Sequence, residues 1–276
     1  MKQIIDLSAA NGTNHNLYEA TQAGISCAFL RTGEGLHGQD PAFSKLSAMV
    51  HAQGWMQSSY HLMAPSSGDP EGQALAMFTL AGKPSPKDCP PPFVDCERNS
   101  PLTGVEPKAW ADCLTRMLAK GDELFQRTIG LYVGTYFLAP MRPFLSLETL
   151  DRPIWIPAYP SLMASVAGAG AVRQAFLAAR AALGKAPGNR SLQVAYQVAT
   201  AALVATKDLP NPIGNPPANA TLWQYAGDAN GSTCPGISTL CDRSTFFGDD
   251  DAWAKFCNMT SAPASAAIAG EVAASS

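Results

Sequence analysis

The chain has 276 residues, of which 46% are hydrophobic and 15% are charged, and its net charge at pH 7 is −3. This length is enough for one large α/β barrel or two small domains. The weakly negative charge argues against a nucleic-acid-binding protein with a broad basic face. The chain has no run of 18 uninterrupted apolar residues, so no membrane span is predicted. The N-terminus lacks the long apolar region of a signal peptide.

Strand and helix patterns alternate along the first 150 residues. Short apolar runs at 3–7, 26–31, 55–62, 93–97 and 129–133 predict five strands. Helical spacing of apolar residues follows each of them, at 14–23, 41–53, 70–80, 107–125 and 144–150. Three further strands are predicted at 153–158, 221–226 and 237–242. Because such alternation implies a parallel sheet with helices outside, we expect an α/β fold, an irregular TIM-like (β/α)5(β)3 barrel.

A long Ala-rich segment, 161–219, interrupts this pattern before the penultimate strand. It predicts two helices, 161–184 and 190–207, and then a loop rich in Pro, Asn and Gly. From Arg152 to Lys207 the chain has six basic residues and no acidic one. We favour a helical hairpin packed on the barrel; the alternative is weak contact of 161–207 with an anionic membrane surface. We expect one domain over 1–261 and a disordered tail at 262–276.

Two carboxylates end the fourth predicted strand. Asp95 and Glu97 are two residues apart, so they point to the same face, whereas Cys96 points to the other. In a confined site, two carboxylates separate each other's pKa values, which suits one for acid catalysis and the other for charge stabilisation. The alternative is a strand end with two solvated acids. Asp6 lies near the end of the first strand, where barrels gather their functional groups, and this favours an active site.

The other motifs give weaker signals. Gly33–Gly38 matches GxGxxG, but no acid lies between Asp40 and Asp69, so we expect a turn at the barrel mouth instead of a nucleotide site. The histidines have no metal-binding spacing, and His61 is expected to be structural. The seven cysteines form no CxxC pair, so a zinc site of the usual spacing is not expected. No other metal and no cofactor is predicted. Pairing of some cysteines in an oxidising compartment remains open.

Aromatic residues recur at the predicted strand ends. A row of rings at a barrel mouth suits sugar rings, whose C–H faces stack on aromatic surfaces. The rings are Tyr60, Tyr132, Trp155, Tyr159, Trp223 and Tyr225.

Several stretches together carry a family resemblance. In order, over 1–160 and 221–249, they are IIDLSAANG, AGISCAFLRTGEG, QGWMQSSYHL, PPFVDCE, GLYVGTYF, RPIWIPAYP, and LWQYAGD followed by LCDRSTFFGD. The sequence resembles the glycoside hydrolase family 25 muramidases, the Chalaropsis-type lysozymes, which include many phage endolysins. The resemblance implies an irregular barrel of five β/α units and three further strands. It also implies cleavage of the β-1,4 bond between N-acetylmuramic acid and N-acetylglucosamine in peptidoglycan.

The resemblance also implies roles for residues at the matching motifs. Glu97 would be the general acid, and Asp95 would stabilise positive charge by orienting the substrate's acetamido group as an internal nucleophile. Asp6 and Asp242 would be supporting acids. Glycoside cleavage needs a proton for the leaving oxygen and stabilisation of an oxocarbenium-like centre, which this set supplies. The substrate groove would be lined by Arg31, Tyr60, Tyr132, Trp155, Tyr159, Trp223 and Gln224.

Two features differ from the family pattern: the 161–219 insertion is longer than the usual link, and no C-terminal wall-binding repeats are visible. We expect a monomer made in the cytoplasm without a signal peptide. It would act in the periplasm or cell wall of a target bacterium, as a phage endolysin or as an effector delivered by a secretion machine. The alternatives are a non-catalytic sugar-binding protein, which would be expected to have lost its carboxylates, and a glycosidase of another N-acetylated glycan.

Overall fold

The computed structural model describes residues 2–82, 89–97, 105–157, 220–227, 232–246 and 248–257, with isolated positions at 182, 185, 191 and 192. The predicted insertion at 161–219 falls outside these ranges except for those isolated positions, and a strand begins directly after it at Ala220. Tyr159 and the predicted tail at 262–276 also lie outside the described residues.

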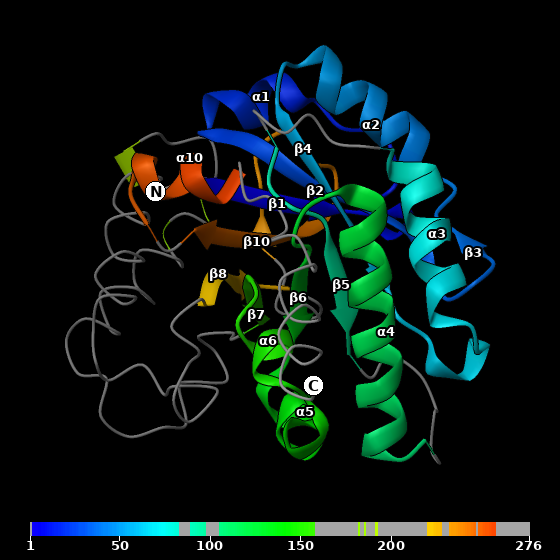
Figure 1. Ribbon diagram of the computed structural model, residues 1–276. Coiled ribbons are helices and arrows are strands. Elements are labelled where there is room, and N and C mark those ends of the chain that lie inside the picture. The colour runs from blue at the N-terminus through cyan, green and yellow to red at the C-terminus, as the bar shows by residue number, and fades with distance from the viewer. Residues whose placement is uncertain are drawn as a thin grey trace, which may run out of the picture.

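Within the described residues, eight strands close a barrel (Figure 1). Seven of them run parallel in chain order: β1 (Gln3–Leu7), β2 (Ile25–Glu34), β4 (Met56–Leu62), β5 (Phe93–Cys96), β6 (Gly130–Val133), β7 (Ile154–Pro157) and β8 (Ala220–Ala226). The eighth, β10 (Leu240–Phe246), closes the ring by pairing antiparallel with both β8 and β1. Two short strands, β3 (Gly38–Gln39) and β9 (Ser232–Thr233), pair with β2 and β10. The predicted α/β barrel is confirmed.

Helices follow the first five barrel strands and cover the outside of the barrel. They are α1 (Leu17–Gln22), α2 (Phe43–Ala52), α3 (Pro70–Ala81), α4 (Pro107–Phe125), α5 (Thr135–Met141) and α6 (Leu147–Leu150). Proline at the first helical position starts α3 and α4, where its missing N–H costs no hydrogen bond. The Asp69 side chain caps α3 by accepting from Gly72 N at 2.9 Å. Two helices were not predicted: α5, which contains Pro140, and α10 (Asp250–Cys257).

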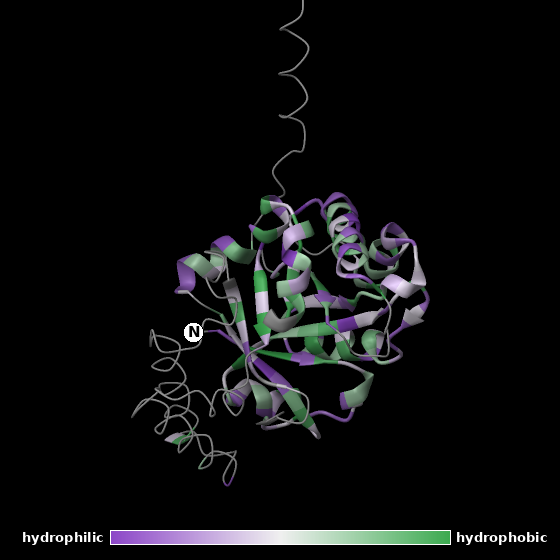
Figure 2. Cartoon of the chain, turned by 90° about the horizontal axis from the view of Figure 1, so that it is seen from below, coloured by the Kyte–Doolittle hydropathy of each residue, from purple (hydrophilic) through white to green (hydrophobic). Residues whose placement is uncertain are grey.

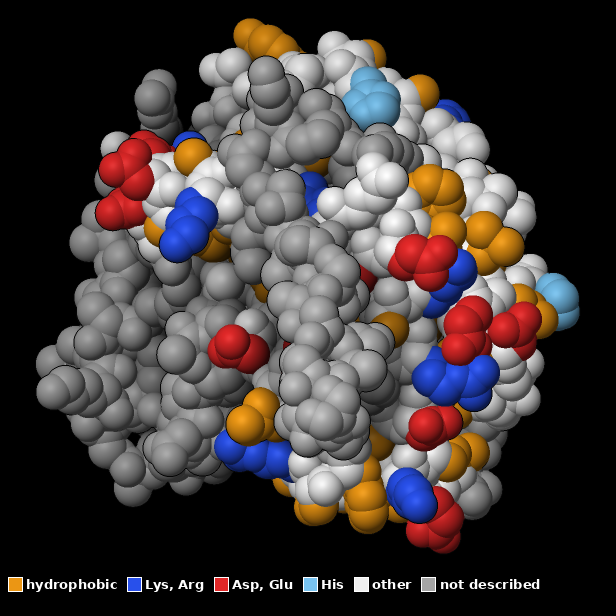
Figure 3. Space-filling view, in the orientation of Figure 1, with side chains coloured by type: hydrophobic (Ala, Val, Ile, Leu, Met, Phe, Trp, Pro, Cys, Tyr) orange, Lys and Arg blue, Asp and Glu red, His pale blue; other side chains and the backbone are white. Residues whose placement is uncertain are grey.

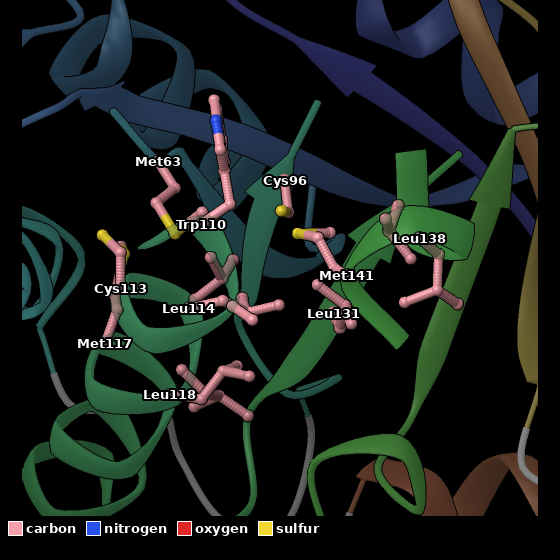
Figure 4. Close-up of a cluster of buried hydrophobic side chains, with 14 of the residues drawn as sticks. Met63, Cys96, Trp110, Cys113, Leu114, Met117, Leu118, Leu131, Leu138 and Met141 are labelled. Carbon is pink, nitrogen blue, oxygen red and sulfur yellow. The ribbon is translucent and has the colours of Figure 1, made fainter. Parts of the chain in front are cut away.

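The outer faces of the strands pack against these helices. Val94 and Cys96 of β5, with Leu131 and Val133 of β6, belong to one buried cluster with Trp110 and other apolar residues of α4 (Figure 4). A second cluster lies between β1, β2 and the helices α1 and α2. Figure 2 shows hydrophobic stretches along the strands, interrupted by hydrophilic ones, and both kinds of residue on the surrounding helices. Burial of the alternate apolar side chains of each strand thus fixes which side chains point into the barrel.

Inside the barrel, the side chains change from apolar to polar along each strand. Ile4, Phe29, Phe93 and Leu222 belong to a buried apolar cluster. Two residues further along the same strands, and hence on the same face, lie Asp6, Arg31, Asp95 and Gln224. The barrel therefore has an apolar floor and a polar layer at the carboxyl ends of its parallel strands.

Helix α10 completes the apolar floor. Its Trp253 and Phe256 rings lie 5.0 Å and 5.3 Å from the ring of Phe246 at the end of β10. Arg127 holds the end of this helix by donating from Nη2 to the carbonyl oxygens of Phe256 and Cys257, at 3.3 Å and 2.9 Å. These contacts hold the last helix of the described chain against the end of β10 and against the segment that follows α4.

The helical surface carries mixed charges. Over α3 and α4, acidic and basic side chains are interspersed (Figure 3), and Arg116 pairs with Glu71 across the two helices at 2.7 Å. None of the described helices is long and apolar enough to cross a membrane.

Candidate active site

A cavity of about 280 Å³ opens at the polar end of the barrel. Because β10 runs antiparallel, its beginning meets the ends of β1, β4 and β5 here. The residues that line the cavity are Asp6, Ser8, Ala10, Asn11, Arg31, Tyr60, Leu62, Asp95, Glu97, Leu240 and Asp242. All the predicted catalytic carboxylates and two of the predicted binding residues, Arg31 and Tyr60, therefore share one cavity.

Alternation along β5 and the pairing of β1 with β10 bring the carboxylates together. Asp95 and Glu97 both line the cavity, while Cys96 between them is buried in the cluster under α4, as the alternation predicted. Asp6 and Asp242 are direct cross-strand partners in the β1–β10 register. Asp6 and Asp95 are almost fully buried, at 6% and 5% exposure, so their side chains meet solvent only through the cavity.

An amide connects the Asp6–Asp242 pair. Gln224 Nε2 lies 3.2 Å from Asp6 Oδ2 and 3.3 Å from Asp242 Oδ2, and donates to both. The Tyr132 hydroxyl donates to Gln224 Oε1 at 2.8 Å. Four strands, β1, β6, β8 and β10, are thus joined by one hydrogen-bonded chain directly below the cavity.

Arg31 is held by a residue that sequence reasoning missed. Asp40 accepts a hydrogen bond from Arg31 Nε at 2.8 Å, and its carboxylate also accepts from the backbone N–H groups of Ala9 and Ala42. Burial is the largest influence on Arg31 and opposes its charge, but the hydrogen bond to Asp40 and the charge interactions with nearby acidic groups together outweigh it and raise the pKa of Arg31. Asp40 follows the β2–β3 hairpin without any spacing signal, so only the fold shows its role.

Tyr60 lies on an aromatic cluster centred on Trp155. The Trp155 ring lies edge-on to the rings of Tyr132, Phe29 and Tyr60, at 4.8, 5.0 and 6.0 Å. Its Nε1 donates to Ser244 Oγ at 2.9 Å. Burial, reinforced by the charges of Asp6 and Asp95, raises the pKa of Tyr60 well above its ordinary value. Tyr60 therefore presents a protonated hydroxyl at the cavity.

Comparison with known proteins identifies the family. The family model of the glycosyl hydrolases family 25 matches residues 5–175, more than half of the chain. The chain belongs to glycosyl hydrolase family 25. The resemblance found in its motifs is thereby confirmed, and so is the prediction that it is a glycoside hydrolase. No curated protein matches the chain in sequence.

Solved structures share the fold of this family 25 chain. The lysozyme from Streptomyces coelicolor has a TM-score of 0.67 at 18% identity and covers 93% of this chain and 97% of its own. The muramidase from Trichobolus zukalii has a TM-score of 0.65 at 17% identity, covering 94% and 99%. The modular autolysin LytC from Streptococcus pneumoniae, solved with a synthetic peptidoglycan ligand, has a TM-score of 0.58 at 13% identity, covering 89% and 46%.

Several predicted binding residues of this family 25 hydrolase lie below or behind the cavity. Tyr132, Trp155 and Gln224 are buried and reach the cavity only through the carboxylates and rings that they contact. Trp223 is buried on the other face of β8 from Gln224, since successive strand residues alternate. Direct contact of these side chains with substrate stays a prediction, and Tyr159 lies outside the described residues.

The loop after β1 supplies cavity residues that the motifs did not single out. Ser8 and Asn11 line the cavity, and Asn11 Nδ2 donates to Leu240 O at 3.1 Å. Ser8 N donates in turn to Asn11 Oδ1 at 2.9 Å. These bonds tie the first loop to the beginning of β10 and so fix one wall beside Asp242.

The weaker motifs have structural roles. His61 is buried, with Nδ1 2.8 Å from Thr32 Oγ1 and Nε2 2.8 Å from Gly35 O, and burial lowers its pKa to about 4. The GxGxxG stretch is the β2–β3 hairpin, where a side chain on Gly33 would collide with Gly38 O and Gly35 has a φ of +60°. The structure contains no disulfide among the seven cysteines, six of which are buried. The described residues contain no group of three or more side chains that could hold a metal ion.

Proposed function

We propose that this family 25 hydrolase is a peptidoglycan muramidase that cleaves the β-1,4 bond between N-acetylmuramic acid and N-acetylglucosamine. The observation that carries the proposal is the single cavity onto which Asp95 and Glu97 open beside Asp6 and Asp242. The likeness to a lysozyme, a muramidase and an autolysin solved with a peptidoglycan ligand supports this substrate class.

Glu97 donates a proton to the glycosidic oxygen as the bond to the leaving sugar breaks. Asp95, two residues earlier on the same face of β5, accepts a hydrogen bond from the acetamido N–H of the other sugar. This turns the acetamido oxygen toward the anomeric carbon, where it acts as an internal nucleophile. The attack closes a ring between the acetamido group and the anomeric carbon. The surrounding carboxylates stabilise the positive charge on the anomeric centre and on this new ring. Water then opens the intermediate, with Glu97 as the base.

Arg31 fits the same substrate. Its guanidinium lies on the cavity and its Nε is fixed by Asp40, so its orientation is set before substrate binds. Peptidoglycan carries lactyl and peptide substituents with carboxylate and carbonyl oxygens, which a guanidinium binds well. Chitin has no such substituents, so Arg31 favours peptidoglycan over a plain N-acetylated glucosamine polymer.

The test is digestion of purified Gram-negative peptidoglycan, with mass spectrometry of the products beside a Glu97→Gln control. Wild-type protein is expected to release fragments with N-acetylmuramic acid at the new reducing end, and the nearly isosteric variant is expected to release none while its circular dichroism is unchanged. Full activity of Glu97→Gln would remove Glu97 as the acid. Cleavage of chitin but not of peptidoglycan, or binding without cleavage, would refute the muramidase.

We further propose that the protein acts on the bacterial cell wall as an endolysin, because its substrate lies outside the cytoplasmic membrane. Added to cells whose outer membrane has been permeabilised, the protein should lyse them, and Glu97→Gln should not. If the protein hydrolyses purified peptidoglycan but does not lyse permeabilised cells, the proposed cleavage reaction stands and the proposed endolysin role is wrong.

A further inference from the structure

The Asp6–Asp242 pair has an unusual arrangement for two acids. The two residues are direct partners in the β1–β10 register, and the side chains of both line the cavity. Directly opposed residues of antiparallel strands have Cβ atoms only about 4.5–5.5 Å apart. At this spacing, each negative charge raises the proton affinity of the other, and two such carboxylates tend to retain one proton between them.

Gln224 is placed to prevent this sharing. A side-chain amide nitrogen has two hydrogens, and Nε2 of Gln224 directs them to one oxygen of each carboxylate, at 3.2 Å and 3.3 Å. A hydrogen bond donated to a carboxylate stabilises its charged form. Gln224 is 2% exposed, so water competes little for these bonds.

Tyr132 determines which way the amide points. Its hydroxyl donates to Gln224 Oε1 at 2.8 Å, and it is itself 6% exposed. A flipped amide would direct Oε1 at two carboxylates and leave Nε2 facing the phenol. The Tyr132 hydroxyl at Oε1 and the two acids at Nε2 therefore specify the same orientation of the Gln224 amide.

We propose that Gln224 is a positioning residue that bridges Asp6 and Asp242 and keeps both carboxylates ionised, and that Tyr132 holds it in the required orientation. The proposal rests on the proposed function, because the two charges matter when positive charge develops in the cavity. The proposal gives the Trp-Gln-Tyr stretch of β8 a role in the electrostatics of the site. Gln224 acts through the two acids and does not touch the substrate.

Other groups near the pair also influence its titration. Opposite charge comes from Arg31 on the cavity wall and from Arg243, which follows Asp242. Like charge comes from Asp95 and Glu97. In the described part of the chain, Tyr60, Tyr132 and Cys241 are further titratable groups near the pair. A variant of Gln224 leaves all of them in place, so a change in the titration of the pair reports the bridge itself.

The first test is the pH dependence of kcat/KM on purified peptidoglycan. Gln224→Leu removes the bridge at similar volume and should move the acidic limb upward by about one pH unit, because one carboxylate then keeps its proton to higher pH. At a pH well below both midpoints this corresponds to about a tenfold loss. Tyr132→Phe frees the amide orientation and should move the limb in the same direction by less.

Tyr225→Phe is the matched control. Tyr225 lies on the same strand and donates its hydroxyl to Gln3 Oε1 at 2.7 Å, so this variant loses an equivalent buried phenol–amide bond away from the acids. Its acidic limb should stay where it is. If Tyr132→Phe and Gln224→Leu move the limb no further than Tyr225→Phe does, the positioning role is wrong.

The second test needs no substrate. Carboxyl-carbon NMR titration of Asp6 and Asp242 in the intact protein should show at least one midpoint rising by about one unit in Gln224→Leu. Unchanged midpoints would overturn the proposal whatever the enzyme cleaves. Raised midpoints in a protein that does not cleave peptidoglycan would uphold the bridge and refute only the muramidase.

Discussion

Replacing Asp40 by Asn should destabilise the protein and loosen Arg31 at the same time. The Asp40 side chain is fully buried, whereas the Arg31 side chain is 31% exposed. Asp40 Oδ1 accepts from Ala9 N and Ala42 N, and Oδ2 accepts from Ala9 N and Arg31 Nε. Either orientation of an asparagine amide directs its NH2 group at one of these donors.

The magnitude follows from those contacts. Loss of the charge-assisted bond to Arg31 costs about 1.5–3 kcal/mol, and a buried donor facing another donor adds about 1–3 kcal/mol. We therefore expect Asp40→Asn to lower the free energy of unfolding by about 3–5 kcal/mol. For a chain of this length, the melting temperature should fall by roughly 10 °C.

Urea unfolding, followed by tryptophan fluorescence, measures the free-energy change. The control is Asp112→Asn, which removes an acid whose side chain is 69% exposed and 3.9 Å from Arg116, and which should cost less than about 0.5 kcal/mol. In active protein, Asp40→Asn should also raise KM, because Arg31 loses its fixed orientation. A loss of unfolding free energy no larger than that of the control would refute the reasoning.

Two further predictions concern buried titratable groups. His61 has a pKa of about 4 in the folded protein against about 6.5 when unfolded, so the free energy of unfolding should fall by about 3 kcal/mol as the pH drops from 6.5 to 4. A His61→Gln variant whose free energy of unfolding falls just as steeply over this pH range would contradict this. The Cys234 and Cys241 thiols form a hydrogen bond, which lowers the pKa of Cys234 and raises that of Cys241. Burial favours the protonated form of both thiols, so it opposes the shift of Cys234 and adds to the shift of Cys241. Exchange with oxidised glutathione should therefore form a Cys234–Cys241 disulfide first, and a peptide map showing another pair first, or seven remaining thiols, would refute it.

Local patterns determined most of the barrel. The helix predicted at 107–125 is α4 (Pro107–Phe125), and the strand predicted at 93–97 is β5 (Phe93–Cys96), with Glu97 directly after it. The alternation of Asp95, Cys96 and Glu97 correctly separated the cavity side from the core side. These features depend on periods of 3.6 and 2 residues, which any short stretch of sequence displays.

Segments whose neighbours are distant were predicted less well. The last strand was expected at 237–242 but runs over Leu240–Phe246, so Asp242 lies near its beginning. It still reaches the cavity because β10 is antiparallel to β1, and strand direction leaves no trace in the alternation. Helix α10 has the pattern of an ordinary amphipathic helix, and only the barrel shows that its apolar face closes the floor.

The sequence by itself determined the fold class, the family, and the carboxylates that share the cavity, because spacing along one strand and short motifs carry that information. Only the tertiary structure showed that Asp40 holds Arg31 and that Gln224 bridges Asp6 to Asp242. Gln224 and Asp6 are 218 positions apart in the chain. Their contact arises because barrel closure places β10 between β8 and β1, and no local period of the sequence records how a sheet closes on itself.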